Sequence, residues 1–106
     1  MITVITRFPQ PVGKSQDELK GMFRQSAPRF QTIAGLVRKY YYIADDNTCG
    51  GVYLFRSRAE AEALFDDAFA ASIMARFGAP PRVEFLETPV IVDNEAGTIL
   101  GGDEGA

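Results

Sequence analysis

Residues 36–65 constrain the fold of this 106-residue chain more than any other segment. The run LVRKYYYIA is β-prone, DDNTCGG is rich in turn-forming residues, and VYLF is a second β-prone run. The run SRAEAEALF follows almost at once, with Ser57 and Glu60 at the spacing of a helix-capping box. The segment therefore predicts a β-hairpin, with strands at residues 36–44 and 51–55, that leads directly into a helix.

The residues before this hairpin predict one strand and one helix. Residues 2–8 are β-prone and stop at Pro9, which suits the end of a strand. Ser15 and Glu18 then form another capping box, followed by apolar residues at helical spacing. Because Pro28 lacks an N–H group, we expect this helix to bend or end there.

The residues after the hairpin predict a second helix and a last strand. Asp66 and Asp67 interrupt the helical pattern, so a separate piece of helix is expected after them. Gly78 and the two prolines that follow it stop this helix. We expect the last strand at residues 82–87, with residues 90–92 as its extension.

The resulting order, β-α-β-β-α-β, is that of ferredoxin-like domains, an α+β class with a four-stranded antiparallel sheet. The strands carry apolar residues on both faces, whereas two helices can cover one face only. We therefore expect a homodimer in which two sheets pack together into a dimeric α/β barrel. Residues 1–92 form this domain, and the acidic, Gly-rich residues 93–106 form a tail that is flexible or contacts the partner.

Composition and charge argue against several partners. With 11 basic and 14 acidic residues, the net charge is −3, which disfavours binding to nucleic acid or to an anionic membrane. The chain has no histidine and one cysteine, so the usual ligands of zinc and haem iron are missing, and we expect neither a metal nor a cofactor. A single cysteine and the lack of a signal sequence fit a cytoplasmic protein.

The hairpin also carries the candidate site residues. If Tyr42 lies opposite Tyr53, one face of the hairpin carries Arg38, Tyr40, Tyr42, Tyr53 and Phe55. Arg7 of the first strand and Phe65 of the following helix would then complete a concave site. Rings that stack and hydroxyls that form hydrogen bonds suit a small aromatic or phenolic ligand, and a guanidinium stabilises its anion. We assign catalytic roles to Arg7 and Tyr53 and substrate binding to the other five residues.

Plain structural roles are open for the same residues. Tyrosine fits a half-buried pleated surface, so any one of these tyrosines can be part of the sheet and nothing more. Arg38 on an outer strand can protect the sheet edge, and Arg7 can belong to a structural ion pair. Cys49 has no neighbour that would activate a thiol, so we do not expect it to react.

The segments GLVRKYYYI, GGVYLF, SRAEAEALF and FGAPPRVEF together resemble the small monooxygenase-like proteins of the YdhR type. These belong to the antibiotic-biosynthesis-monooxygenase-like superfamily of dimeric α/β barrels, and the resemblance covers residues 1–93. It implies a ligand site between sheet and helices, and either cofactor-free oxidation of phenols and quinols or haem degradation. The haem-degrading relatives use an Asn, a Trp and a His. The corresponding neighbourhoods here hold Arg7, Phe55 and no histidine, which makes haem degradation improbable.

Three hypotheses follow for the function. The first is a cofactor-independent monooxygenase-like dimer that acts on a small aromatic or quinone-type compound. The second is a non-catalytic or stress-related dimer that binds a small hydrophobic molecule, and the third is a purely structural dimer. Because histidine is absent, the first hypothesis lacks an obvious proton acceptor. Its minimum mechanism is a substrate phenol that ionises beside Arg7.

Overall fold

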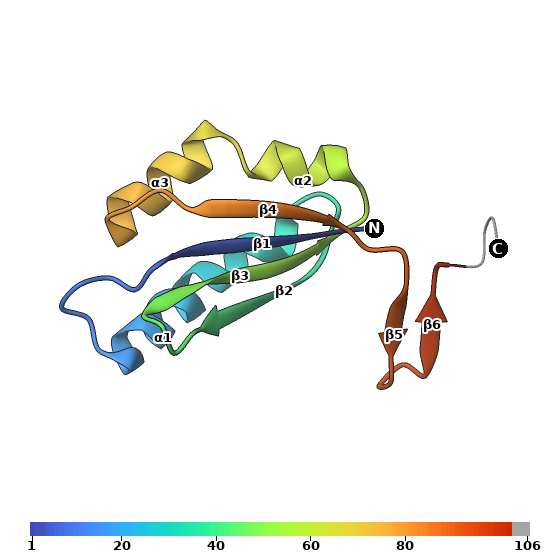
Figure 1. Cartoon of the computed structure of the whole chain (residues 1–106), viewed down its shortest axis with the longest axis horizontal. Coiled ribbons are helices and arrows are strands. Elements are labelled where there is room, and N and C mark those ends of the chain that lie inside the picture. Colours follow the sequence, from blue (N-terminus) through green and yellow to red (C-terminus); the bar gives the residue numbers. More distant parts are fainter. Residues whose placement is uncertain (103–106) are drawn as a thin grey trace.

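We describe residues 1–102 of a computed structural model of the chain. Figure 1 shows one main sheet with helices and a separate small hairpin near the C-terminus. The elements are β1 (Ile2–Pro9), α1 (Gln16–Ser26), the 3₁₀ helix η1 (Ala27–Thr32), β2 (Leu36–Ile43), β3 (Thr48–Phe55), α2 (Arg58–Leu64), α3 (Asp67–Phe77), β4 (Arg82–Glu87), β5 (Ile91–Asp93) and β6 (Thr98–Leu100).

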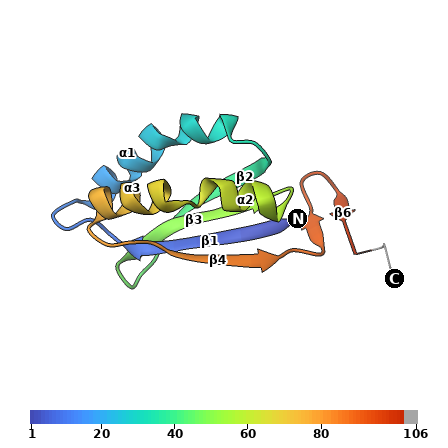
Figure 2. The ribbon, with the colours of Figure 1, turned by 90° about the horizontal axis from the view of Figure 1, so that it is seen from above.

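The main sheet has the strand order β2-β3-β1-β4, and each neighbouring pair is antiparallel. Within residues 1–102 all helices lie on one face of this sheet, and none covers the opposite face, which we call the bare face (Figure 2). The predicted α+β class and ferredoxin-like order are therefore confirmed. A single chain cannot show the dimer, which stays a prediction.

The helix ends follow the sequence signals closely. Ser15 and Glu18 form the full capping box at α1, and Pro28 lies where α1 gives way to η1. At α2, Ser57 accepts from the Glu60 N–H at 3.2 Å, but the Glu60 carboxylate accepts from the Ser57 hydroxyl instead of the backbone. The predicted break at residues 66–67 is confirmed, since Asp66 caps the separate helix α3.

Two groups of buried apolar side chains hold the helices to the sheet. The first lies under α2 and contains Ile2, Val4, Tyr53, Phe55 and Ala61. The second lies between α1 and α3 and contains Phe8, Leu19, Cys49, Ile73 and Phe77. Alternate residues of β1 and β3 contribute to both, because the period of two sends every second side chain to the helical face.

The register of β2 against β3 differs from the one assumed above. Tyr53 lies opposite Lys39, and Tyr42 lies opposite Gly50. The assumed pairing of Tyr42 with Tyr53 is therefore wrong. Because side chains alternate along a strand, this change sends Tyr42 and Tyr53 to opposite faces. A bulge between Leu36 and Arg38 disturbs the pairing near the start of β2.

The segment after β4 is a hairpin of its own. Residues 91–93 pair with residues 98–100 instead of extending β4, so the predicted extension is wrong. The predicted domain boundary at residue 92 falls inside β5. Arg38 and Asp93 form an ion pair of 3.5 Å between β2 and this hairpin. Residues 103–106 of the predicted tail lie outside the described residues.

Within residues 1–102, no helix has both the length and the apolar character needed to span a membrane.

Gly50 provides a test of the packing in the sheet. The Tyr42 hydroxyl donates to the Thr6 carbonyl oxygen at 2.7 Å, and a Cβ at Gly50 would lie 1.9 Å from that oxygen. We expect Gly50→Ala to lower the free energy of unfolding by about 2 kcal/mol or more. Urea unfolding would measure the change.

The matched control is Gly21→Ala in α1, where a Cβ would meet no atom within 4 Å. Alanine there should raise the free energy of unfolding by about 0.5–1 kcal/mol, because glycine is a poor helix former. Equal effects of the two substitutions would contradict the close approach at Gly50.

Candidate functional site

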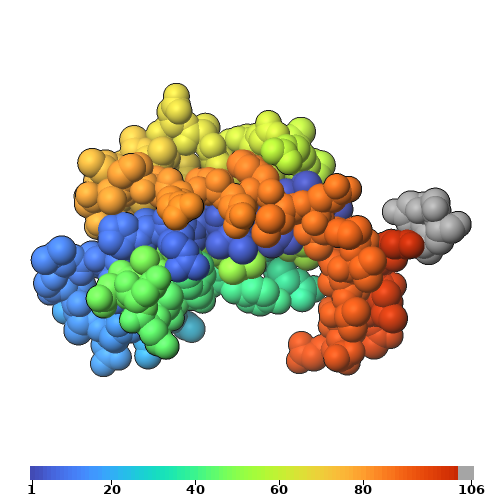
Figure 3. All heavy atoms as spheres, viewed as in Figure 1, coloured from blue at the N-terminus to red at the C-terminus, as the bar shows by residue number. Residues whose placement is uncertain are grey.

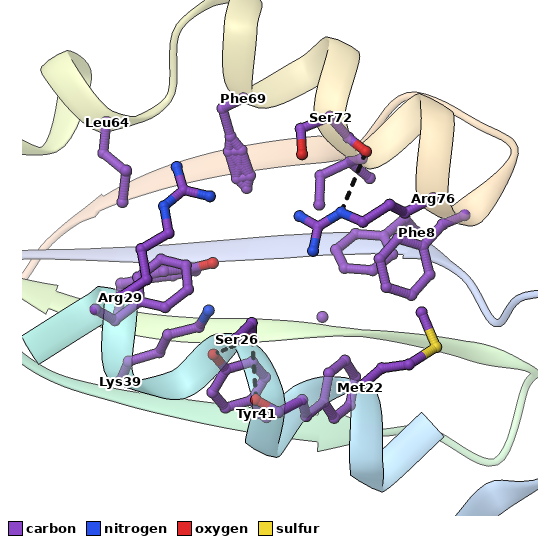
Figure 4. A pocket seen from close by; sticks show the side chains of 17 residues that line it. Phe8, Met22, Ser26, Arg29, Lys39, Tyr41, Leu64, Phe69, Ser72 and Arg76 are labelled. Atoms are coloured by element: carbon purple, nitrogen blue, oxygen red, sulfur yellow. Dashed lines mark hydrogen bonds between the residues drawn. The ribbon is translucent and has the colours of Figure 1, made fainter. Parts of the chain in front are cut away.

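A pocket lies between the helical face of the sheet and helices α1, η1 and α3 (Figure 4). Seven of its seventeen lining residues are aromatic, and two adjacent glycines of β3 lie beneath it. The lining residues are Phe8, Met22, Phe23, Ser26, Arg29, Phe30, Lys39, Tyr41, Gly50, Gly51, Tyr53, Leu64, Phe69, Ser72, Ile73, Arg76 and Phe77.

Gly51 keeps the floor of this pocket free of a side chain. A Cβ at this position would lie 2.8 Å from Cε1 of Tyr53 and 3.0 Å from Cε of Lys39. The two neighbouring side chains therefore occupy the space above the glycine. Any larger residue would displace them.

The charges around the pocket are all positive. Lys39 from β2, Arg29 from η1 and Arg76 from α3 contribute to the lining, whereas no Asp or Glu does so among the described residues. In Figure 4 the two guanidinium groups reach from opposite sides into the space between helices and sheet. Arg76 Nε donates to the Ser72 carbonyl oxygen at 3.4 Å, which helps to orient that side chain. This arrangement attracts an anion.

Lys39 lies among three aromatic rings. Its Nζ is 3.3 Å from the ring centroid of Phe30, 3.9 Å from that of Tyr41 and 4.7 Å from that of Tyr53. The side chain is half-buried, and none of the ion pairs within residues 1–102 includes it. The ring faces attract the ammonium and favour the charged form.

Two other effects favour the neutral form of the Lys39 amine, and together they outweigh the attraction of the rings. Burial, followed by the positive charges of Arg29 and Arg76, lowers the pKa of the amine from 10.5 to about 7. Ion pairing would normally offset such desolvation, but no carboxylate lines this pocket in the described part of the chain. Near neutral pH the amine is therefore present in both its charged and its neutral form.

Tyr41 has a defined hydrogen bond at the pocket wall. The Ser26 hydroxyl donates to the Phe23 carbonyl oxygen at 3.0 Å, and the oxygens of Ser26 and Tyr41 are 2.7 Å apart. With its one proton engaged, Ser26 accepts from the Tyr41 hydroxyl. The Tyr41 oxygen keeps its lone pairs and can accept a hydrogen bond from a ligand.

Tyr53 is the one predicted site residue that lines this pocket. Its side chain is only 3% exposed, and burial raises the pKa of its hydroxyl far above the ordinary value. Phe65 packs edge-on against it at 4.9 Å between ring centroids, and Phe55 is fully buried in the core. Phe55 and Phe65 thus support the pocket from behind and do not line it.

The other four predicted residues lie on the bare face of the sheet. Arg7 stacks over the Tyr42 ring at 5.5 Å, donates to the Thr48 hydroxyl at 2.7 Å and lies 3.7 Å from Asp46. Arg38 pairs with Asp93, and Tyr40 is 57% exposed. The expected convergence of Arg7, Tyr40 and Tyr53 on one cavity does not occur.

The sequence reasoning missed Lys39 and Tyr41 because it assigned them to the opposite face. The prediction that alternate residues of LVRKYYYIA lie on opposite faces of the sheet is correct, but the sequence cannot show which of the two sets of residues faces the helices. Arg29 and Arg76 were missed as well, since each is a single arginine in a helical segment and no sequence pattern marks it as a site residue. One signal was available: Gly50 and Gly51 are the only adjacent glycines near a strand that also carries tyrosines.

The open space in the pocket is small, about 50 Å³. An apolar cavity that admits benzene measures about 150 Å³, so an aromatic ligand must displace part of the lining. The exposed side chains of Arg29 and Arg76 and the half-buried Met22 are long and unbranched, which makes them the side chains most able to move. An aromatic ligand therefore needs these side chains to move before it can enter.

Other chemistry near the pocket is limited. Burial raises the pKa of the Cys49 thiol to about 11, which leaves it protonated and unreactive. Within residues 1–102, no three His, Cys, Asp or Glu side chains come together as a metal site. A wider hollow lies between the main sheet and the terminal hairpin, with residues of β4, α2 and β6 around it; part of this region is visible in Figure 3.

Comparison with solved structures shows where this fold occurs. A protein of unknown function from Nitrosomonas europaea matches with a TM-score of 0.69 and 19% identity, over 87% of this chain and 92% of that one. The monooxygenase ActVA-Orf6 of Streptomyces coelicolor, solved with nanaomycin D, matches with a TM-score of 0.62 and 14% identity, over 87% and 90%. SnoaB of Streptomyces nogalater, a cofactor-independent oxygenase, matches with a TM-score of 0.57 and 19% identity, over 82% and 91%.

The chain therefore has the fold of the antibiotic biosynthesis monooxygenases. The predicted resemblance to that superfamily is confirmed at the level of fold, and the YdhR type specifically is not shown. No protein-family model matches the chain, and no curated protein matches it either.

The lowered pKa of Lys39 predicts how stability depends on pH. Above about pH 7 the folded protein has lost the Lys39 proton, whereas the unfolded chain keeps it up to pH 10.5. The unfolded state then binds more protons, so the free energy of unfolding gains a contribution that rises with pH in this window. We expect that rise in the natural protein and its absence in Lys39→Met.

Urea unfolding of both proteins between about pH 6 and pH 9.5 would measure the difference. Groups that titrate alike in both proteins cancel in this comparison, so the difference between the two profiles reports on Lys39. Parallel pH profiles of the two proteins would show that the Lys39 amine keeps an ordinary pKa.

Proposed function

We propose that the protein is a cofactor-independent monooxygenase that acts on a small aromatic compound with an acidic hydroxyl. The observation that carries this proposal is a pocket with aromatic walls, three cationic side chains and, in the described part of the chain, no carboxylate in the lining. Rings stack on a planar substrate, and the positive charges stabilise its phenolate or enolate form. The fold shared with SnoaB and ActVA-Orf6 agrees with this chemistry.

The reaction needs no electron carrier if the substrate is the reductant. An aromatic C–H and the neighbouring phenol O–H supply two hydrogens and four electrons to O₂. One oxygen atom forms the new carbonyl of a quinone, and the other leaves as water. The electron-rich phenolate reacts with O₂ far more readily than the phenol, so stabilising the anion is the main task of the pocket.

Oxygen uptake with hydroxybenzenes and naphthols tests this proposal. We expect catalysed uptake, with one labelled oxygen atom from O₂ in the product. Arg76→Gln should lower the rate by about ten- to hundredfold, because a charged hydrogen-bond donor in the pocket is worth about 1.5–3 kcal/mol.

The matched control is Arg24→Gln on the exposed surface of α1, which does not line the pocket. This variant should keep the full rate. Loss of activity in Arg7→Gln, with Arg76→Gln unaffected, would refute this pocket and move the site to the bare face, where the structure places Arg7.

Binding without catalysis is the second candidate. The supporting observation is the small open volume, which leaves little room for both a substrate ring and O₂. In that case a phenol would bind and change neither its own mass nor the oxygen concentration. The labelled-oxygen measurement separates this function from the first one.

We further propose that two copies pack through their bare sheet faces. Ile5, Val52, Leu54 and Leu86 share that face, and Leu86 is 38% exposed in the single chain. The β5–β6 hairpin projects beyond the sheet (Figure 1) and exposes Val92, Ile99 and Leu100, which suits contact with a partner. The pocket on the opposite face stays accessible in such a dimer.

Light scattering should give twice the 11.6 kDa mass of one chain at micromolar concentration. Leu86→Glu should halve that mass, because a buried unpaired carboxylate opposes association. Val12→Glu is the control: Val12 is fully exposed, so this variant should stay dimeric. A monomeric natural protein would refute the sheet-to-sheet dimer.

A further inference from the structure

We propose that Lys39 is the catalytic base: its neutral amine removes the proton from an acidic hydroxyl of an aromatic substrate bound in the pocket. This inference rests on the proposed function and names the proton acceptor that a chain without histidine otherwise lacks. The O–H bond breaks, an N–H bond forms on Nζ, and the electron pair stays on the substrate oxygen. No oxidant takes part in this step.

The position of Lys39 fits the role. Its Nζ lies against the rings of Phe30, Tyr41 and Tyr53, which come from three different elements. A planar substrate that stacks on one of these rings brings its edge to the amine. The Lys39 amine lies 3.9 Å from the ring centroid of Tyr41, and the hydroxyl oxygen of that ring can accept a hydrogen bond from a substrate hydroxyl and so help to orient it.

The surrounding charges favour the products of the transfer. Every charged group of the described chain that lines this pocket is a cation, namely Arg29 and Arg76 besides Lys39 itself. Before the transfer, these guanidinium groups oppose a third positive charge on Lys39. After the transfer, the substrate anion lies among three cations, which offsets that repulsion. Tyr41 and Tyr53 are the other titratable groups that face the amine.

The two arginines of the pocket keep their protons at neutral pH, and the other lysines lie elsewhere. A lysine whose pKa is near the working pH is a far better base than an ordinary one, and Lys39 has a pKa of about 7. The two other lysines, Lys14 and Lys20, are exposed and do not line the pocket. An arginine cannot give up its proton at neutral pH.

The first test uses 4-nitrophenol, a single-ring phenol whose anion absorbs visible light. At a pH below its own pKa, we expect binding to the natural protein to raise the nitrophenolate absorbance. Lys39→Met should lower the ionised fraction of the bound probe about tenfold, because a charge next to the anion is lost. Lys20→Met on the exposed face of α1 should behave as the natural protein does.

Lys39→Arg separates proton transfer from simple attraction. Arginine keeps the positive charge but is never a neutral base, so this variant should bind preformed nitrophenolate yet lose oxygen uptake from neutral phenols. In the natural protein the uptake rate should fall as the pH decreases through about 7, and this limb of the profile should be missing in Lys39→Arg.

The outcomes distinguish this inference from the proposed function. Lysine-dependent formation of nitrophenolate without any oxygen uptake would support the role of Lys39 and refute the monooxygenase. Oxygen uptake that is unchanged in Lys39→Met at every pH would support the monooxygenase and overturn the role of Lys39. Failure of the natural protein to bind 4-nitrophenol would also overturn it. Thermal unfolding would confirm that each variant is folded.

Discussion

The alignment of β2 on β3 is the constraint on which the rest of the structure depends. Gly50 lets the Tyr42 hydroxyl cross β3 and donate to the Thr6 carbonyl oxygen of β1. A side chain at Gly50 would prevent this contact. The bond ties the outer strand to the central one and agrees with the register that places Lys39 opposite Tyr53. A shift by one residue would reverse every side chain of β2 between the two faces.

This alignment gives the two faces of the sheet different chemistry. The helical face carries Lys39 and Tyr41 into a pocket whose described lining has no carboxylate, so the Lys39 amine has aromatic rings and two arginines around it but no acidic partner. The bare face carries Arg7 and Arg38, and both arginines have acidic partners. Cations that are paired contribute to structure, whereas the unpaired cations of the pocket are available to a ligand.

Local signals were enough to predict most of the fold. Ser15, Pro28, Ser57 and Asp66 act over three or four positions of the chain, and the helix ends follow these signals, although the second capping box forms only in part. The hairpin is confirmed as well, but β3 begins at Thr48, within the predicted turn. The predicted extension of β4 failed because residues 91–93 pair with residues that the sequence pattern had placed in a tail. This pairing is local, since only residues 94–97 separate the two strands, but strands of three residues in an acidic, Gly-rich segment give a weak sequence signal.

The sequence by itself determined the α+β order, the helix ends, the absence of histidine and the presence of two alternating sets of side chains on the hairpin. Only the tertiary structure decided which set faces the helices, and with it the change from Arg7, Tyr40 and Tyr42 to Lys39 and Tyr41 as pocket residues. The physical reason is that alternation divides the side chains of a strand into two sets but does not say which set faces the helices. The pairing of β2 with β3 and the packing of α1, η1 and α3 on one side of the sheet decide which set that is.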